Sequence, residues 1–90
     1  MTKEKLQPTG DTTELDAGLK ELVLHNDDVN TFDYVIESLV DVCGHDATQA
    51  EQCALIAHYK GKCGVKMGTY DELKPPHDGM RERKLTVTIK

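Results

Sequence analysis

The chain has 90 residues, a formal net charge of −5 at pH 7 and only 4% aromatic residues. A domain this small buries only about 60–65% of the surface that its unfolded chain exposes, which argues against a large enclosed active site, and the acidic balance argues against nucleic acid as a partner. No apolar run approaches the ~20 residues of a membrane span and the N-terminus lacks a signal-peptide core, so we expect a soluble, cytoplasmic protein without membrane contact.

Residues 1–19 mix charged residues with proline and glycine, contain few apolar residues and show no sustained period. This composition predicts a flexible N-terminal arm in front of a single domain at residues 20–90. The domain opens with an apolar Leu-Val-Leu run, which predicts a first strand over residues 20–26.

A helix is predicted next, over residues 32–43, because apolar residues recur there at the i, i+3, i+4, i+7 spacing of one buried face. Asn30 or Thr31 offers the N-cap and Gly44 the stop. A second helix is expected to begin after Asp46 and to end before Gly61. Its small residues let another element approach its backbone closely.

The C-terminal part predicts a strand at residues 63–67 and another, with period-two alternation, at residues 85–89. Between them Thr69 has the spacing of a capping box. Pro75 and Pro76 would remove amide donors from a helix interior, so we expect a third helix that is split or starts near Pro75.

The resulting order is strand, helix, helix, strand, helix, strand. The economical solution is an α+β two-layer sandwich, with one three-stranded sheet and the helices on one face. The pattern alone leaves the strand directions open.

Four polar residues, His25, Asn26, Asp27 and Asp28, stand where the first strand should end. Two carboxylates with amide and imidazole acceptors suit a ligand that donates hydrogen bonds and carries positive charge. A solvated turn rich in Asn and Asp is the alternative interpretation.

Several segments together resemble, in order and spacing, the ClpS adaptors of bacterial Clp proteolysis. They are Leu24-His25-Asn26-Asp27-Asp28, the helix at residues 32–39, Ala57-His58-Tyr59-Lys60-Gly61-Lys62 and Cys63-Gly64-Val65. The resemblance covers roughly residues 20–66. It implies three antiparallel strands with three helices, and a non-enzymatic adaptor that binds the free α-amine and large apolar first residue (Leu, Phe, Tyr or Trp) of N-degron substrates. The adaptor would deliver these substrates to a Clp AAA+ unfoldase.

The resemblance also assigns residues to two parts of a binding site. The α-amine would be held by Asn26, Asp27, Asp28 and His58. The side-chain pocket would be lined by Asn30, Phe32, Val35, Leu39, Ala54 and Ala57. An α-amino group has a pKa of about 7.7–8.0 and offers three donors when protonated, so acceptors suit it.

Two departures from the family pattern concern selectivity and docking. Phe32 stands at a gate position that is usually Met, and Ala54 and Ala57 replace residues that are commonly larger, which can shift the preference among first residues. The segment after Val65 matches poorly, which leaves open which unfoldase is served.

Other functions have weaker support in the sequence. A ClpS-like regulatory domain that docks on an AAA+ partner without binding an N-degron is the main alternative. Three cysteines without an export signal fit reduced thiols, and the absence of a Cys-x-x-Cys pair argues against zinc. Asp27, Asp28 and His58 lack an accompanying nucleophile or phosphate loop, so we expect no catalysis and no cofactor.

Overall fold

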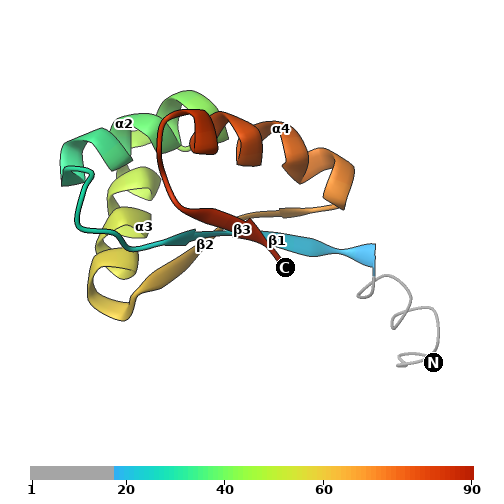
Figure 1. Ribbon diagram of the computed structural model, residues 1–90, viewed down its shortest axis with the longest axis horizontal. Coiled ribbons are helices and arrows are strands. Elements are labelled where there is room, and N and C mark those ends of the chain that lie inside the picture. The colour runs from blue at the N-terminus through green and yellow to red at the C-terminus, as the bar shows by residue number, and fades with distance from the viewer. Residues whose placement is uncertain (1–17) are drawn as a thin grey trace.

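The computed structural model describes residues 18–90, and the predicted order of strands and helices is confirmed within this range (Figure 1). The elements are β1 (Lys20–His25), α2 (Phe32–Cys43), α3 (Ala47–Lys60), β2 (Lys62–Gly68), α4 (Tyr70–Glu82) and β3 (Val87–Ile89). The expected arm at residues 1–19 lies, apart from its last two residues, outside the described part. Within that part no helix is both long and apolar enough to cross a membrane.

Strand β1 is the centre of a three-stranded antiparallel sheet of order β2-β1-β3. Its Leu-Val-Leu run is almost completely buried, since a central strand is paired on both edges. Leu22 is opposite Ile89 and Leu24 is opposite Val87 in the pairing with β3. The last strand is shorter than predicted and begins at Val87, although Leu85 before it is also buried.

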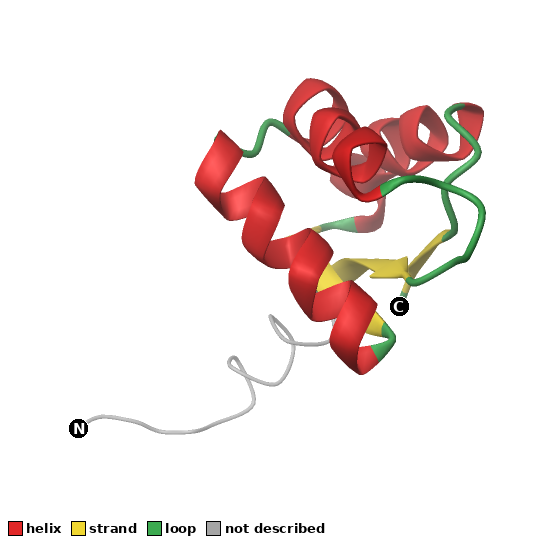
Figure 2. Cartoon of the chain, turned by 90° about the vertical axis from the view of Figure 1, so that its left-hand side faces the viewer, coloured by secondary structure: helices red, strands yellow, loops and turns green. Residues whose placement is uncertain are grey.

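The three described helices lie on the same side of this sheet (Figure 2), which confirms the two-layer α+β arrangement. Leu22 and Leu24, two positions apart on β1, project to one face of the sheet. They join one core cluster with Leu39 of α2, Leu73 of α4 and small residues of α3. The small side chains of α3 therefore let it pack closely, as the sequence indicated.

The ends of α2 and α3 are fixed by local signals that the sequence displays. Thr31 caps α2, because its Oγ1 accepts from the Tyr34 amide at 3.1 Å, and Gly44 closes the helix with a φ of 74°. Asp46 caps α3 at 2.7 Å from the Gln49 amide, and a glycine with φ 93° ends it. Of the two predicted caps for α2, the structure uses Thr31.

The prediction of a third helix that is split or starts near Pro75 is wrong, because α4 begins at Tyr70 and runs without interruption through Pro75 and Pro76. The prolines remove only the two amides that would bond to carbonyls of the exposed first turn, where water can replace them. A complete capping box offsets this loss: Thr69 Oγ1 accepts from the Glu72 amide at 3.2 Å, and Glu72 Oε1 accepts from the Thr69 amide at 2.8 Å. Pro76 itself is buried in the contact with the core.

We expect Thr69→Ala to lower the free energy of unfolding by about 1 kcal/mol, because α4 has two prolines and depends on its cap. Equilibrium unfolding in urea measures this change. Thr48→Ala, an exposed threonine inside α3 with no capping role, is the matched control and should leave stability nearly unchanged. An equal loss in both variants would contradict the role of the capping box.

Candidate functional site

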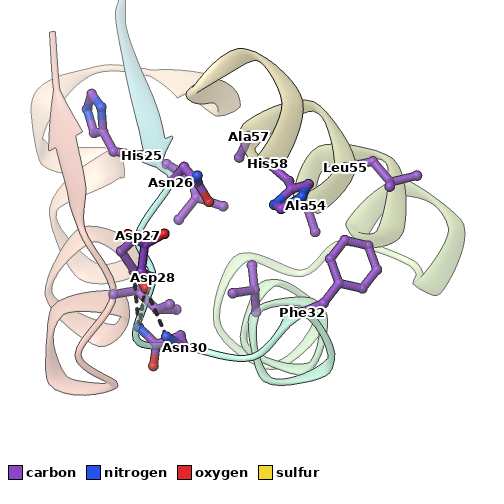
Figure 3. Close-up of a pocket in the computed structure, with 13 residues that line it drawn as sticks. His25, Asn26, Asp27, Asp28, Asn30, Phe32, Ala54, Leu55, Ala57 and His58 are labelled. Carbon is purple, nitrogen blue, oxygen red and sulfur yellow. Dashed lines mark hydrogen bonds between the residues drawn. The ribbon is translucent and has the colours of Figure 1, made fainter.

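A cavity of about 490 Å³ opens between the β1–α2 loop, the start of α2 and the last turns of α3 (Figure 3). This volume lies within the range of pockets that hold small ligands. Its polar lining comes from His25, Asn26, Asp27, Asp28, Asn30 and His58, and its apolar lining from Leu24, Phe32, Val35, Ala54, Leu55, Ala57 and Leu85.

All but one of the predicted site residues line this cavity. The exception is Leu39, which is 0% exposed and belongs to the core cluster. Val35, one helical turn earlier on α2, does line the cavity. The helix therefore carries Leu39 past the pocket into the interior, where it packs against the sheet.

The loop after β1 is joined to the end of α3 by a backbone hydrogen bond. The Asn26 amide donates to the Gly61 carbonyl at 2.9 Å. Gly61 is the C-cap of α3, and His58 lies in the last turn of that helix. This bond brings Asn26 and His58 to the same side of the cavity although they are far apart in sequence, and Figure 3 shows both facing the same space.

The Asp27 carboxylate holds the loop in shape. Its Oδ1 accepts from the backbone amides of Val29 and Asn30, each at 2.9 Å, and its Oδ2 accepts from Asn30 Nδ2 at 3.1 Å. Burial opposes ionisation of Asp27, but these hydrogen bonds outweigh it and lower the pKa of the carboxyl below its ordinary value. Asp27 is therefore an anion that the loop itself stabilises.

Asn30 extends this network to the turn between α4 and β3. Its Nδ2 also donates to the Lys84 carbonyl at 2.9 Å, and Lys84 has a left-handed φ of 71°. Beside it, the Tyr34 hydroxyl donates to the Arg83 carbonyl at 2.9 Å. The Asn30 side chain was predicted as part of the pocket wall. Its amide group donates both of its hydrogen bonds to atoms that hold the loop to the rest of the fold.

Asn26, Asp28 and His58 have exposed side chains, and none of them forms a side-chain hydrogen bond with another residue of 18–90. The His58 ring makes an edge contact with the Tyr59 ring, at 5.1 Å between centroids. The acceptors of these three residues therefore remain open to a ligand, whereas most of the Asp27 capacity is already used.

The apolar side of the cavity combines small buried residues with two large ones at its mouth. Ala54 and Ala57 are 4% and 3% exposed, and their small side chains leave room above α3. Phe32 of α2 and Leu55 of α3 are 38% and 39% exposed and line the cavity from the two helices (Figure 3). An apolar group entering here would be covered on two sides.

Three lining residues were not predicted: Leu24, Leu55 and Leu85. Leu55 could have been found, because it lies one helical turn before His58 on the same face. Leu85 follows α4 and reaches the cavity only through the tertiary fold. His25 belongs to the predicted polar cluster and borders the cavity, but its ring turns away in Figure 3 and its Nε2 lies 2.8 Å from Thr88 Oγ1 on β3.

The arrangement can accept several hydrogen bonds from a cationic group and bury an apolar group beside it. Within residues 18–90 no set of three His, Cys, Asp or Glu side chains is placed to hold a metal ion. The predicted polar residues thus line one side of the cavity, opposite its apolar lining.

A sequence model of the family described as "ATP-dependent Clp protease adaptor protein ClpS" matches residues 19–88. The ClpS adapter of Pectobacterium carotovorum is 36% identical over 74 residues, which are 80% of this chain and 62% of the relative. That of Acetivibrio thermocellus is 41% identical over 51 residues, 57% of this chain and 52% of the relative. The chain thus spans about half to three fifths of these relatives.

The fold is also similar to a solved structure, that of Agrobacterium tumefaciens ClpS2 bound to L-phenylalaninamide. The TM-score is 0.70 at 23% sequence identity, and the alignment covers 81% of this chain and 95% of the solved one. At this identity the likeness shows that the two chains share the fold.

We expect Asp27→Ala to lower the free energy of unfolding at pH 7 by about 1–2 kcal/mol, because it leaves the loop amides without their charged acceptor. Asp28→Ala, next to it but without such bonds, should change stability by less than about 0.5 kcal/mol. Urea unfolding of both variants measures the difference. Equal losses would show that Asp27 does not organise the loop.

The stability difference between the wild type and Asp27→Ala is also expected to depend on pH. A carboxyl whose pKa is lowered by folding contributes stability above its unfolded pKa of 3.8 and loses it as the pH falls through the folded value. The stability gap between the wild type and Asp27→Ala should therefore narrow as the pH falls from 7 to below 3.8. A constant gap would contradict the charged hydrogen bonds.

Proposed function

Because the chain belongs to the ClpS family of Clp protease adaptors, we propose that it is a non-enzymatic adaptor for N-degron substrates. It binds the free α-amine and the large apolar first residue of a substrate protein and delivers that protein to a Clp AAA+ unfoldase. The observation that carries this proposal is one pocket with open acceptors on one side and an apolar recess on the other.

The polar side of the pocket suits a protonated α-amino group. Such a group has a pKa of about 7.7–8.0 and presents three N–H donors that an internal peptide bond lacks. Asn26 Oδ1, the Asp28 carboxylate and an imidazole nitrogen of His58 can accept them. Asp27 adds negative charge, and its Oδ2, which accepts only from Asn30, has capacity for one more bond.

The apolar side suits the first side chain of the substrate. Burying a Leu or Phe side chain contributes roughly 1.5–3 kcal/mol, and Phe32, Val35, Ala54 and Ala57 supply the surface for it. The relative of the same fold from Agrobacterium tumefaciens is bound to L-phenylalaninamide, which has a free α-amine and an aromatic side chain. Leu, Phe, Tyr and Trp are therefore the proposed first residues.

Delivery is the second half of the proposal. The family description links these proteins to the Clp protease, so the proposed partner is its AAA+ unfoldase in the cytoplasm. Residues 1–19 are proposed to act in the handover of the substrate rather than in its capture. The cavity is lined by residues between positions 24 and 85, so capture and handover are proposed to use different parts of the chain.

We expect fluorescence anisotropy to show binding of peptides that begin with Leu, Phe, Tyr or Trp, and no binding after acetylation of the α-amine. Asp28→Ala should weaken binding at least ~10-fold, since a charge-assisted hydrogen bond contributes about 1.5–3 kcal/mol. Asp33→Ala, an exposed acid in the first turn of α2 outside the cavity, is the matched control and should bind nearly as the wild type does.

Binding that survives acetylation would disprove the amine site. A folded protein that binds none of the peptides would move the assignment to a regulatory domain that docks on the unfoldase without holding an N-degron. Co-purification with the unfoldase, tested on the same sample, would then identify that role.

A second test addresses the apolar recess. Ala54→Leu adds volume at the pocket wall and should weaken binding of Trp and Phe peptides about 10-fold, with a smaller effect on Leu peptides. Ala47→Leu, at the exposed first position of α3, is the control. Equal weakening for all first residues, or the same effect in the control, would show that Ala54 does not bound the side-chain pocket.

A further inference from the structure

Three reduced cysteines lie behind the pocket wall and take no part in the proposed binding function. Cys43 ends α2, Cys53 lies in the middle of α3 and Cys63 lies near the start of β2. Cys43 and Cys53 are buried, whereas Cys63 is half-buried and reaches solvent. The three thiols therefore differ in the access that a reagent has to them.

Cys53 and Cys63 meet across the junction of α3 and β2. Their Sγ atoms lie 4.0 Å and 3.4 Å from the same acceptor, the carbonyl oxygen of Gly64. Because α3 and β2 are consecutive and pack against each other, this neighbourhood is a fixed feature of the fold.

We propose that Cys53 and Cys63 form a thiol modification site, which a low-molecular-weight disulfide such as oxidised glutathione converts to an intramolecular disulfide. The Cys63 thiolate attacks one sulfur of the reagent, and the S–S bond of the reagent breaks to release one glutathione thiolate. The Cys53 thiol gives its proton to water and attacks Cys63 Sγ, which releases the second glutathione. Two protein thiols lose two electrons, and one glutathione disulfide becomes two glutathione molecules.

Exposure sets the order of these steps. Cys53 is only 4% exposed, so a tripeptide reagent reaches Cys63 first. Burial, and after it the neighbouring Cys63 and Cys43 thiols, raise the pKa of the Cys53 thiol. Cys53 is therefore a protonated thiol at neutral pH, and it reacts second, losing its proton to water as it attacks the electrophilic Cys63 sulfur.

Cys43 is the neighbour that this assignment leaves out. Burial raises the pKa of Cys43 to about 11, with Lys66 opposing the shift. Its Sγ does not share the Gly64 carbonyl with the other two thiols. Within residues 18–90 no set of ligands is placed for a metal ion, which leaves thiol exchange as the chemistry that fits the pair.

The test treats the reduced full chain with oxidised glutathione under native conditions and follows its mass. Trypsin cuts at Lys60 and Lys62, between Cys53 and Cys63, and a Glu-specific protease cuts at Glu51, between Cys43 and Cys53. The digest therefore distinguishes all three pairings. We expect loss of two hydrogens from the protein, a crosslinked Cys53–Cys63 peptide and a Cys43 that is still alkylated after unfolding.

Variants separate the steps. Cys53→Ala should accumulate a glutathione adduct on Cys63, since the resolving thiol is gone, and Cys43→Ala should still form the disulfide. The same reaction in concentrated urea gives the pairing of the unfolded chain. A native protein that gives the urea mixture, pairs through Cys43, or keeps a stable adduct on Cys63 would overturn the proposal.

This inference does not depend on the proposed function, because its readout is the mass of the protein and not the binding of a peptide. The outcome of the peptide titration therefore leaves it untouched. Reversal of the mass change by dithiothreitol, together with a lower urea midpoint after that reduction, is the expected second readout. The new bond would fasten α3, which carries Ala54 and His58, to the neighbouring strand.

Discussion

The burial of β1 between two antiparallel partners is the constraint on which the rest of the molecule depends. Leu22 and Leu24 fill the core beneath the helices, and hydrogen bonds to β2 and β3 fix the strand on both edges. A strand held in this way delivers the residues after it to one place with little freedom. That place is the gap between the first turn of α2 and the last turn of α3, where the cavity opens.

The polar groups at this gap are divided between those that hold the loop and those that face the cavity. Asp27 and Asn30 satisfy each other, two loop amides and the Lys84 carbonyl. Asn26, Asp28 and His58 keep their acceptors exposed. Acceptors on a loop that is held by its own hydrogen bonds need little reordering on binding, which would lower the entropy cost of holding the proposed α-amino group.

Helix α3 has small side chains both on the face toward the cavity and on the face toward β2. Ala54 and Ala57 leave the recess on one face, and Cys53 contacts β2 on another. The C-terminal end of α3, which carries His58, is close to the β1–α2 loop, because Gly61 both ends the helix and accepts a hydrogen bond from the Asn26 amide. One helix therefore couples pocket volume, the position of His58 and the placement of the thiol pair.

The sequence by itself determined the elements and their order, because these depend on local signals: the period of the apolar residues and the caps at Asp46, Gly44 and Gly61. Local signals also marked the polar cluster at the end of the first strand, whereas the other candidate site residues came from the resemblance to the ClpS family. Only the tertiary structure decided how those residues divide their work. Leu39 packs into the core, and Leu85 lines the pocket. Helix α4 continues through its prolines because a capping box and a buried face stabilise it. Asp27 forms hydrogen bonds that hold the loop. Contacts between residues distant in sequence have no periodic or capping signature, so packing alone fixes them.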